Sequence, residues 1–176
     1  VWTGLNLEVS SACCTPKPLQ FHTALQWGGF KATVMDGDSS WPAGLLTGLG
    51  TPWNTLQLGG IVRLSSRELS FEVVQGRMRV QGSANVLLDD VSSRVTTLDR
   101  LGSYQLDVNG DAQGQVQMSL STVDGALQLT GQGSVSASGL HFSGEARANE
   151  AERGALDNLL NIIGRREGDR SVISIG

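Results

Sequence analysis

The fold class follows from residues 69–86, which read LSFEVVQGRMRVQGSANV. Apolar side chains alternate with polar ones along this stretch, first at Leu69, Phe71 and Val73 and then again from Met78 onward. An alternation with a period of two is typical of β-strands that bury one face. Glycine between the two runs suits a short hairpin connection. The stretch therefore predicts antiparallel strands that share one apolar face.

The same alternation extends over most of the chain. Further alternating runs begin at Leu5, Leu19, Leu25, Phe30, Leu56, Ile61, Ala84, Leu106, Val116, Leu127 and Leu140. Some runs end in a glycine that takes the next inward-facing position, at Gly82, Gly110, Gly131 and Gly144. Glycine at such a position lets a sheet bend or a neighbouring layer approach. We expect a mainly β protein with a strongly curved antiparallel sheet, a meander that can fold over into a groove or roll.

Two segments interrupt the β pattern. Residues 41–50 predict a short helix, with Ser40 near its cap and Pro42 in its first turn. Residues 149–165 predict an amphipathic helix that Asn149 can cap. Its apolar stripe consists of Leu156, Leu159, Leu160 and Ile163. We expect this C-terminal helix to pack on one face of the sheet.

The composition limits the number of domains and the class of partner. We interpret the 176 residues as a single domain spanning residues 1–176. The net charge is −4 and no basic cluster stands out, which argues against nucleic-acid binding. No apolar run reaches the roughly 18 residues that span a bilayer. Because the chain begins at Val1, we interpret it as a processed or truncated product that could have lost an anchor or signal.

No group of residues predicts catalysis. His22 and His141 each stand beside a phenylalanine in a predicted strand and would face the polar side, where we expect surface histidines. Asp89 and Asp90 are neighbours in a predicted turn, whereas glycosidase carboxylates come from separate elements that face a cleft. The motifs of serine hydrolases, zinc proteases and P-loop enzymes do not occur. We therefore predict a protein that is not an enzyme and has no catalytic residues.

Metal and cofactor sites are not predicted either. Residues 107–111 resemble the opening of a calcium loop, but Ala112 and Met118 stand where the loop glycine and the bidentate glutamate belong. Cys13 and Cys14 lack the spacing of a zinc or redox motif. Their α-carbons lie about 3.8 Å apart across the peptide bond, which would strain a disulfide between them. We expect buried or oxidation-sensitive structural cysteines.

Three large aromatic residues form a further candidate site. Trp41, Trp53 and Phe30 could either line a ligand box or pack within the protein. Aromatic side chains bury large areas and contribute much of the packing energy of protein cores. We therefore interpret the three residues as core and segment packing.

Several segments carry a resemblance to a known family. They read WPAGLL (41–46) followed by LGTPWNTL (49–56), LGSY (101–104) followed by Leu106, FSGEA (142–146) and LDNLLNIIGRREGDRSVISIG (156–176). These segments are spread over about three-quarters of the chain. Before residue 25, only Cys13-Cys14-Thr15-Pro16 can be aligned. With these motifs the chain resembles type II secretion system protein N, also described as the general secretion pathway protein N family.

The resemblance implies a location and a set of partners. This family is an accessory part of the machine that moves folded proteins across the outer membrane of Gram-negative bacteria. The domain is expected on the periplasmic face of the inner membrane, where a single-pass N-terminal helix, absent from this chain, would anchor the full-length form. The implied partners are the connector protein C, the secretin protein D and the platform proteins L and M. The resemblance carries over no catalytic, cofactor or metal residues.

Two functions follow from these expectations. The first is a protein-interaction module of the secretion machine that offers an edge strand or a helix face to a partner. The expected edge strands lie at residues 5–9 and 171–175. The second function, from a weaker resemblance to AsmA-like envelope proteins, is a lipid or hydrophobic-ligand groove, which needs an uncovered apolar concave face. Because the helix at residues 149–165 must bury its stripe on the concave side, the first function is favoured.

Overall fold

The computed structural model describes residues 4–50, 53–136 and 138–176. Thr51 and Pro52 of the central motif lie outside the described residues. The strands are β1 (Gly4–Val9), β2 (Leu19–Gln26), β3 (Gly29–Val34), β4 (Gly37–Pro42), β5 (Leu58–Val74), β6 (Arg77–Ser93), β7 (Gly102–Gly110), β8 (Val116–Gly125), β9 (Leu127–Ser136), β10 (Gly139–Ala148), β11 (Arg165–Glu167) and β12 (Arg170–Ile175). The helices are the 3₁₀ helices η1 (Ala43–Leu49) and η2 (Glu150–Glu152) and the α-helices α1 (Trp53–Leu56) and α2 (Arg153–Ile163). The protein is therefore mainly β, as the sequence predicts.

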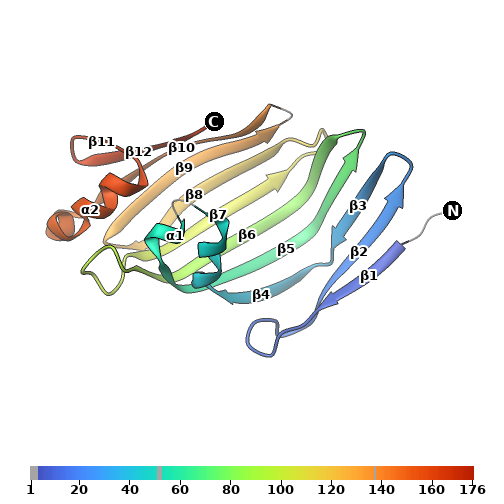
Figure 1. The fold of residues 1–176 in the computed structure, drawn as a ribbon, viewed down its shortest axis with the longest axis horizontal. Helices are drawn as coiled ribbons and strands as arrows, with labels where there is room; N and C mark the ends of the chain where they lie inside the picture. The colour runs from blue at the N-terminus through green and yellow to red at the C-terminus, as the bar shows by residue number, and fades with distance from the viewer. Residues whose placement is uncertain (1–3, 51–52, 137) are drawn as a thin grey trace.

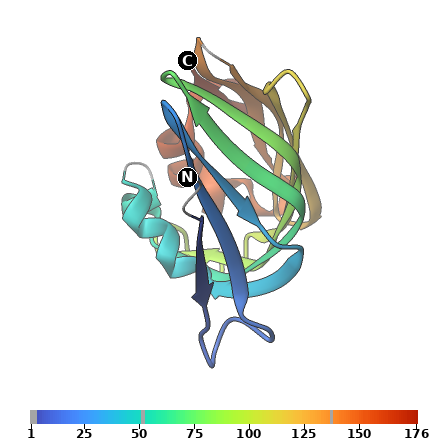
Figure 2. The same cartoon turned by 90° about the vertical axis from the view of Figure 1, so that its right-hand side faces the viewer.

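The strands follow one another across a single sheet almost in chain order. The hydrogen-bonded order is β1-β2-β3-β5-β6-β7-β8-β9-β10-β12-β11, and β4 pairs with β5 beside this path. Each described pairing is antiparallel. Figure 1 shows the sheet from β1 at one end to β11 and β12 at the other, and Figure 2 shows its curvature. The predicted curved antiparallel meander is confirmed, and the sheet is open because its first and last strands do not pair.

Apolar side chains of neighbouring strands share one face of the sheet. The registers place Phe71 opposite Val80 and Val108 opposite Met118, and residues directly opposite each other point to the same side. Figure 2 shows that the sheet curves around the side on which the helices lie, which we call the hollow face. The period of two in the sequence thus places the apolar residues on the hollow face and the polar residues on the outer face.

The C-terminal helix covers one end of the hollow face. Leu156, Leu159 and Leu160 of α2 are fully buried, in one cluster with Leu127 of β9 and Tyr104 of β7. Figure 1 places α2 at the end of the sheet that holds β9 to β12. The predicted packing of an amphipathic helix on the sheet is confirmed, because the three leucines belong to the predicted apolar stripe.

The predicted helices exist, but their ends differ from those expected. Asn149 caps the C-terminal segment, since its Oδ1 accepts a hydrogen bond from the backbone N–H of Glu152 at 3.0 Å. The helix ends earlier than predicted, because Arg165–Glu167 pair with β12 as β11. The short helix η1 begins at Ala43, because residues 40–42 pair with β5 as the end of β4.

Glycine explains how the sheet curves so strongly. Gly82 has a φ of +92°, and a Cβ atom there would lie 2.3 Å from the backbone oxygen of Glu68. This close approach coincides with a bulge in β5, and bulges increase the local twist. Farther along the sheet, Gly131 lies opposite Gly144, and a Cβ at Gly144 would lie 2.6 Å from the backbone oxygen of Thr130. The glycines that end the alternating runs therefore permit close backbone approach, as the sequence predicts.

The buried Tyr104 couples the stability of the fold to alkaline pH. Its side chain is 3% exposed, and its hydroxyl donates a hydrogen bond to the backbone oxygen of Leu127 at 2.9 Å. Burial raises the pKa of Tyr104 well above its ordinary value of 10.0, because the phenolate would lose its hydration. A raised pKa in the folded state stabilises the fold below the pKa of the unfolded chain, and this stabilisation is lost as the pH rises above it.

The free energy of unfolding is therefore expected to fall above pH 10, by up to about 1.4 kcal/mol per pH unit. Tyr104→Phe should remove this dependence and cost about 1 kcal/mol at neutral pH, because the buried hydrogen bond is lost. Urea unfolding at about pH 8 and about pH 11 measures both effects. The chain has one tyrosine, so phenolate absorbance reports its ionisation directly. Ionisation of Tyr104 near pH 10 in the folded protein would contradict the expected effect of its burial.

Candidate functional site

One end of the sheet presents an unpaired strand. β1 is the first strand in the hydrogen-bonded order, and all six of its residues are exposed. Leu5, Leu7 and Val9 lie on its hollow-face side and are 63%, 54% and 43% exposed. A further strand could add to this edge, because β1 offers backbone hydrogen-bonding groups together with an apolar row.

The hydrogen bonds of β2 determine which way the β1 backbone points. The carbonyl of Gln20 accepts a hydrogen bond from the N–H of Met35 at 2.9 Å, just past the end of β3, so Gln20 points towards the β3 side. Because this direction alternates along a strand, the next residue, Phe21, points towards β1. Phe21 lies opposite Leu7. We infer that these two residues exchange the backbone hydrogen bonds between β1 and β2.

The free edge consists of the backbone groups of Asn6 and Glu8. By the same alternation, their N–H and C=O groups point away from β2, whereas those of Leu7 point towards it. On the outer face, Asn6 Oδ1 lies 2.5 Å from Nδ1 of His22. This contact holds the Asn6 side chain against β2. Backbone groups at Asn6 and Glu8 therefore remain accessible to another strand.

The opposite end of the sheet is protected against strand addition. β11 has three residues, Arg165–Glu167, and all of them are charged. Arg165 and Arg170 donate hydrogen bonds to Glu167, and these bonds, that from Arg165 first, lower the pKa of the Glu167 carboxyl. Short charged edge strands discourage pairing with another chain. The two ends of the sheet therefore differ in their capacity to bind a strand.

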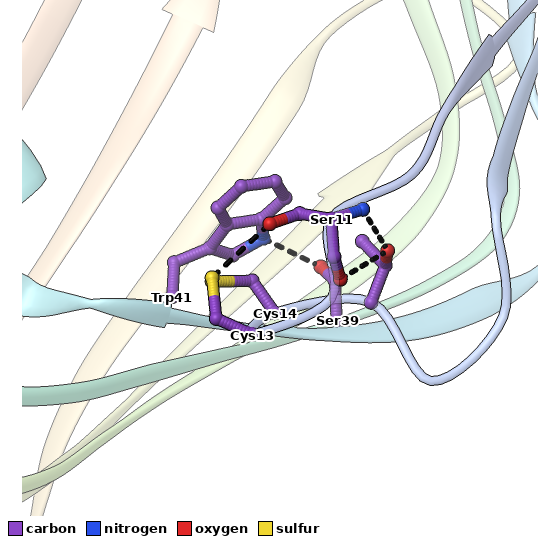
Figure 3. The surroundings of a disulfide bond; sticks show 6 residues. Ser11, Cys13, Cys14, Ser39 and Trp41 are labelled. Atoms are coloured by element: carbon purple, nitrogen blue, oxygen red, sulfur yellow. Dashed lines mark hydrogen bonds between the residues drawn. A yellow bond between two sulfur atoms is a disulfide. The ribbon is translucent and has the colours of Figure 1, made fainter.

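The outer edge of β4 is partly covered by the loop between β1 and β2. The backbone N–H of Ser40 donates a hydrogen bond to the carbonyl of Cys14 at 2.6 Å, and Figure 3 shows this loop beside the strand that carries Ser39 and Trp41. β4 also ends in Pro42, which has no N–H to donate. Within the described ranges, β1 is thus the edge strand that combines length, an apolar row and free backbone groups.

Cys13 and Cys14 lie within this covering loop (Figure 3). The structure joins them in a disulfide with a Cα–Cα distance of 3.8 Å, although the sequence argues that such a bond would be strained. The hydroxyl of Ser11 donates a hydrogen bond to Sγ of Cys13 at 3.1 Å, and the N–H of Cys14 donates to the carbonyl of Ser11 at 3.1 Å. Cys14 is buried, as expected, and Cys13 is exposed. We interpret the pair as a structural part of the loop.

Two apolar hollows lie between β1 and the helices on the hollow face. One, of about 250 Å³, is lined by Trp41, Pro42, Leu45, Leu46, Val62, Leu64 and Val86. The other, of about 220 Å³, is lined by Leu19, Phe21, Val34, Gly37, Ser39, Leu64, Ser66, Leu69 and Phe71. The two hollows share Leu64, and we call them together the groove. None of these lining residues is charged.

The strands around the groove keep their charges on the outer face. Glu8 of β1, Lys31 of β3 and Asp38 of β4 all alternate with hollow-face residues and so point outward. Inside the groove, the indole N–H of Trp41 donates a hydrogen bond to Oγ of Ser39 at 2.9 Å. The groove can therefore make extensive apolar contacts but offers few hydrogen-bonding groups.

The histidines weighed for catalysis lie on separate strands. His22 contacts Asn6 on the outer face. His141 lies on β10, and its Nε2 is 3.4 Å from Oγ of Ser138. Both histidines are exposed, as the sequence predicts. The structure does not bring them together.

The neighbouring carboxylates Asp89 and Asp90 form ion pairs with different arginines. Asp89 lies 2.7 Å from Arg63, and Asp90 lies 2.6 Å from Arg100. Arg100 also contacts Asp124 at 2.6 Å, and its hydrogen bonds to Asp124 and then Asp90 raise its pKa. The two carboxylates thus diverge, as expected for adjacent residues. They lie in β6, at its bulge, so the predicted turn at these residues is wrong.

The segment that resembles a calcium loop is divided between a strand and a turn. Asp107 of β7 accepts hydrogen bonds from Asn85 and Gln105 at 2.6 and 2.9 Å. Asp111 accepts one from the backbone N–H of Gln115 at 2.8 Å and closes the turn before β8. Among the described residues, no three His, Cys, Asp or Glu side chains form a group suited to a metal ion.

The aromatic residues do not all pack as predicted. Trp41 lines the groove, whereas Phe30 and Trp53 are 44% and 39% exposed. The interpretation as core packing is therefore wrong for Phe30 and Trp53. Phe30 lies opposite Val73, on the hollow face of the sheet. Its alternation with polar neighbours places it on the apolar face, but the sequence does not show that its side chain stays 44% exposed there.

The two predicted edge strands have different outcomes. The strand at residues 5–9 is β1 and lies at the end of the sheet. The strand at residues 171–175 belongs to β12, which β11 covers along residues 170–172, so this edge prediction is wrong along that length. The sequence missed β11 because three charged residues give no alternating apolar pattern.

Comparison with known proteins identifies a family for the chain. A family model described as "Type II secretion system (T2SS), protein N" matches residues 1–173. No curated protein matches the chain, and no solved structure matches it. Of the helices in the described part of the chain, none has the length and apolar character needed to cross a membrane.

Proposed function

The chain belongs to the type II secretion system protein N family, and from this premise we propose that it binds other components of the secretion machine through the free edge of β1. Membership makes it an accessory component of type II secretion. The bound partner would contribute an extended segment that continues the sheet beyond β1. The protein would thus act as an assembly module.

The free edge of β1 is the observation that carries this proposal. Its six residues are exposed, its outward backbone groups at Asn6 and Glu8 are accessible, and its apolar row continues the hollow face. Strand addition uses these features, since main-chain hydrogen bonds provide affinity and alternate side chains provide specificity. The protected state of β11 supports the choice of β1 rather than the other end of the sheet.

The chemistry of β1 specifies the segment that would bind. Leu5, Leu7 and Val9 form the row on the hollow face, whereas Glu8 supplies the charge on the outer face. A complementary strand would therefore carry apolar residues at alternate positions and uncharged or basic residues between them. Its backbone would pair with Asn6 and Glu8.

We place this contact in the periplasm and name the connector protein C and the secretin protein D as the first partners to test. The platform proteins L and M are the further partners. The family match supports an envelope machine as the setting. The full-length protein would present this domain from an inner-membrane anchor, which brings β1 within reach of periplasmic segments of the other components.

Binding of the domain to the purified periplasmic regions of proteins C and D tests the proposal. Interferometry across a salt series should show saturable binding with a Kd of about 1–10 μM to at least one of them. The affinity should change little with salt, because backbone pairing and apolar contacts are screened far less than exposed charges. An absence of binding to both C and D at tens of micromolar would contradict direct contact with these two partners. The same result with L and M would then contradict the proposal as a whole.

A further inference from the structure

The open part of the hollow face exposes more apolar side chains than strand addition at β1 requires. Leu25, Phe30 and Met78 are 61%, 44% and 56% exposed and face the hollow side. They share the hollow face with the apolar row of β1 and with Phe21 and Phe71, which line the groove. Scattered exposed apolar residues are ordinary, but a contiguous apolar surface marks a binding site.

The helices do not close this surface. α2 buries Leu156 and Leu160 at the far end, in the cluster that contains Leu127. Leu45 of η1 lines the groove and yet is 62% exposed. The expectation that the C-terminal helix fills the concave side therefore holds for one end of the sheet only. η1 and α1 cover the part of β5 and β6 beside Leu58 and Val91. Among the described residues, the concave face stays open mainly over β1 to β3 and the adjoining parts of β5 and β6.

The chemistry of the groove selects hydrocarbon over water and over peptide. A bound water needs about two to four polar partners, whereas the lining offers Ser39 and Ser66, and Ser39 already accepts the hydrogen bond of Trp41. A peptide that crossed the groove would bury backbone N–H and C=O groups, and these must be paired. β4 and β5 pair with each other and β5 also pairs with β6, so only the outer edge of β4 could offer such a partner, and the loop that carries Cys14 partly covers it. An uncharged hydrocarbon chain needs no such partner.

The groove also indicates where the polar end of such a ligand lies. No lining residue carries a positive charge that could receive a buried carboxylate or phosphate, and burial of an unpaired charge is strongly unfavourable. The polar end must therefore stay in water at the open side, beside β1 to β3. An open trough tolerates a large head group there. The hollows have volumes of about 250 and about 220 Å³, each below the roughly 300–1,000 Å³ of sites that enclose a whole small molecule, so they suit part of a ligand such as one chain.

We propose that the groove binds one acyl chain of a membrane phospholipid, with the head group in water at the side of β1. The neutral lining complements the hydrocarbon, and the exposed row from Leu25 to Met78 guides the chain towards Leu64. The lining of the groove contains no residue of β1, so this function can be tested separately from strand addition, which uses the backbone edge and the apolar row of β1.

Vesicles of phosphatidylethanolamine and phosphatidylglycerol that contain a pyrene-acyl phosphatidylglycerol test the proposal. The chain is incubated with the vesicles, separated from them by flotation, and assayed for pyrene fluorescence and lipid mass. The expected result is about one phospholipid per protein chain. Protein that leaves the vesicles without lipid would overturn the proposal. Uptake of a pyrene fatty acid but no phospholipid would overturn the assignment to phospholipid.

Gly37→Leu provides a variant that fills the groove without unfolding the chain. A Cβ at Gly37 would lie 3.8 Å from Cδ2 of Leu19, an ordinary contact, and would point into the groove that both residues line. Phospholipid uptake should fall at least about tenfold, whereas the melting temperature should hold or rise because an apolar hollow is filled. Lower phospholipid uptake together with an unchanged or higher melting temperature would show that the variant blocks the groove and does not misfold.

Leu45→Glu and Val123→Glu form a matched pair of surface variants. Both residues are exposed, at 62% and 57%, but Leu45 lines the groove and Val123 does not. Leu45→Glu should lower uptake at least about tenfold by placing a charge against hydrocarbon, and Val123→Glu should leave it unchanged. Equal uptake by these two variants would overturn the location of the site. Glu8→Pro should keep full uptake, since it alters only the edge.

Discussion

Leu160→Ala is expected to lower the free energy of unfolding by about 2–5 kcal/mol, because it removes a fully buried side chain and leaves a cavity. Leu160 is 0% exposed and lies in the cluster where α2 meets the sheet, together with Leu156 and Leu127. Protein stability is typically about 5–15 kcal/mol. One substitution should therefore remove a large fraction of it.

Asn161→Ala provides the control for Leu160→Ala. Asn161 is the next residue of α2 and is exposed, and alanine favours helix more than asparagine does. The free energy of unfolding of the Asn161→Ala variant should change by about 0.5 kcal/mol or less. Chemical unfolding of both variants measures the difference. A loss below about 1 kcal/mol for Leu160→Ala would contradict the tight packing of α2 on the sheet.

The sequence predicts this packing because helix and sheet signals agree there. The stripe that includes Leu156 and Leu160 has the period of a helix, and Asn149 marks its start. Strands with a period of two supply the apolar face that the stripe needs. Local signals of this kind do not depend on strand order. They therefore predicted the fold class and the C-terminal helix correctly.

The long central hairpin was harder to predict. β5 and β6 each have 17 residues, but the sequence divides each into separate short alternating runs. A bulge near Glu68 and the glycine at Gly82 shift the alternation, although the strands continue through both positions. β4 was missed because Gly37–Pro42 has no apolar alternation and forms a strand by pairing with β5. The continuous strands β5 and β6 and the strand β4 thus depend on pairing with neighbouring strands, which the local sequence pattern does not show.

The candidate site was predictable only in part. The sequence placed an edge strand at residues 5–9, but strand order, which decides edge status, is not encoded in any single strand. β11 covers the other expected edge along residues 170–172, and its sequence gives no strand signal. The sequence also underestimates how much of the apolar concave face stays uncovered, for a similar reason. The helix stripe shows that a helix covers part of the sheet, and only the three-dimensional arrangement shows how much remains uncovered.

Glu8→Pro is expected to weaken binding of the secretion partner at least about tenfold, because it removes one outward N–H and places a ring at the pairing edge. Proline is tolerated on an edge strand when its nitrogen faces solvent. The N–H of Glu8 points away from β2, so the hydrogen bonds between β1 and β2 remain. The melting temperature should therefore change little.

Glu8→Ala is the matched control, because it removes the same carboxylate but keeps the backbone N–H. Its partner affinity should stay within about threefold of the unchanged chain. Interferometry with the component that binds the unchanged domain compares the two variants. Equal loss of affinity in both would show that the Glu8 side chain, and not the backbone edge, makes the contact.

Hydrogen exchange of the β1 amides, with and without saturating partner, tests strand addition most directly. By the alternation along β1, the N–H groups of Asn6 and Glu8 point outward, whereas that of Leu7 points towards Phe21 of β2. Strand addition predicts that bound partner slows exchange most at Asn6 and Glu8, because both amides gain a backbone acceptor. Unchanged exchange at both amides in the saturated complex would contradict binding through the β1 edge.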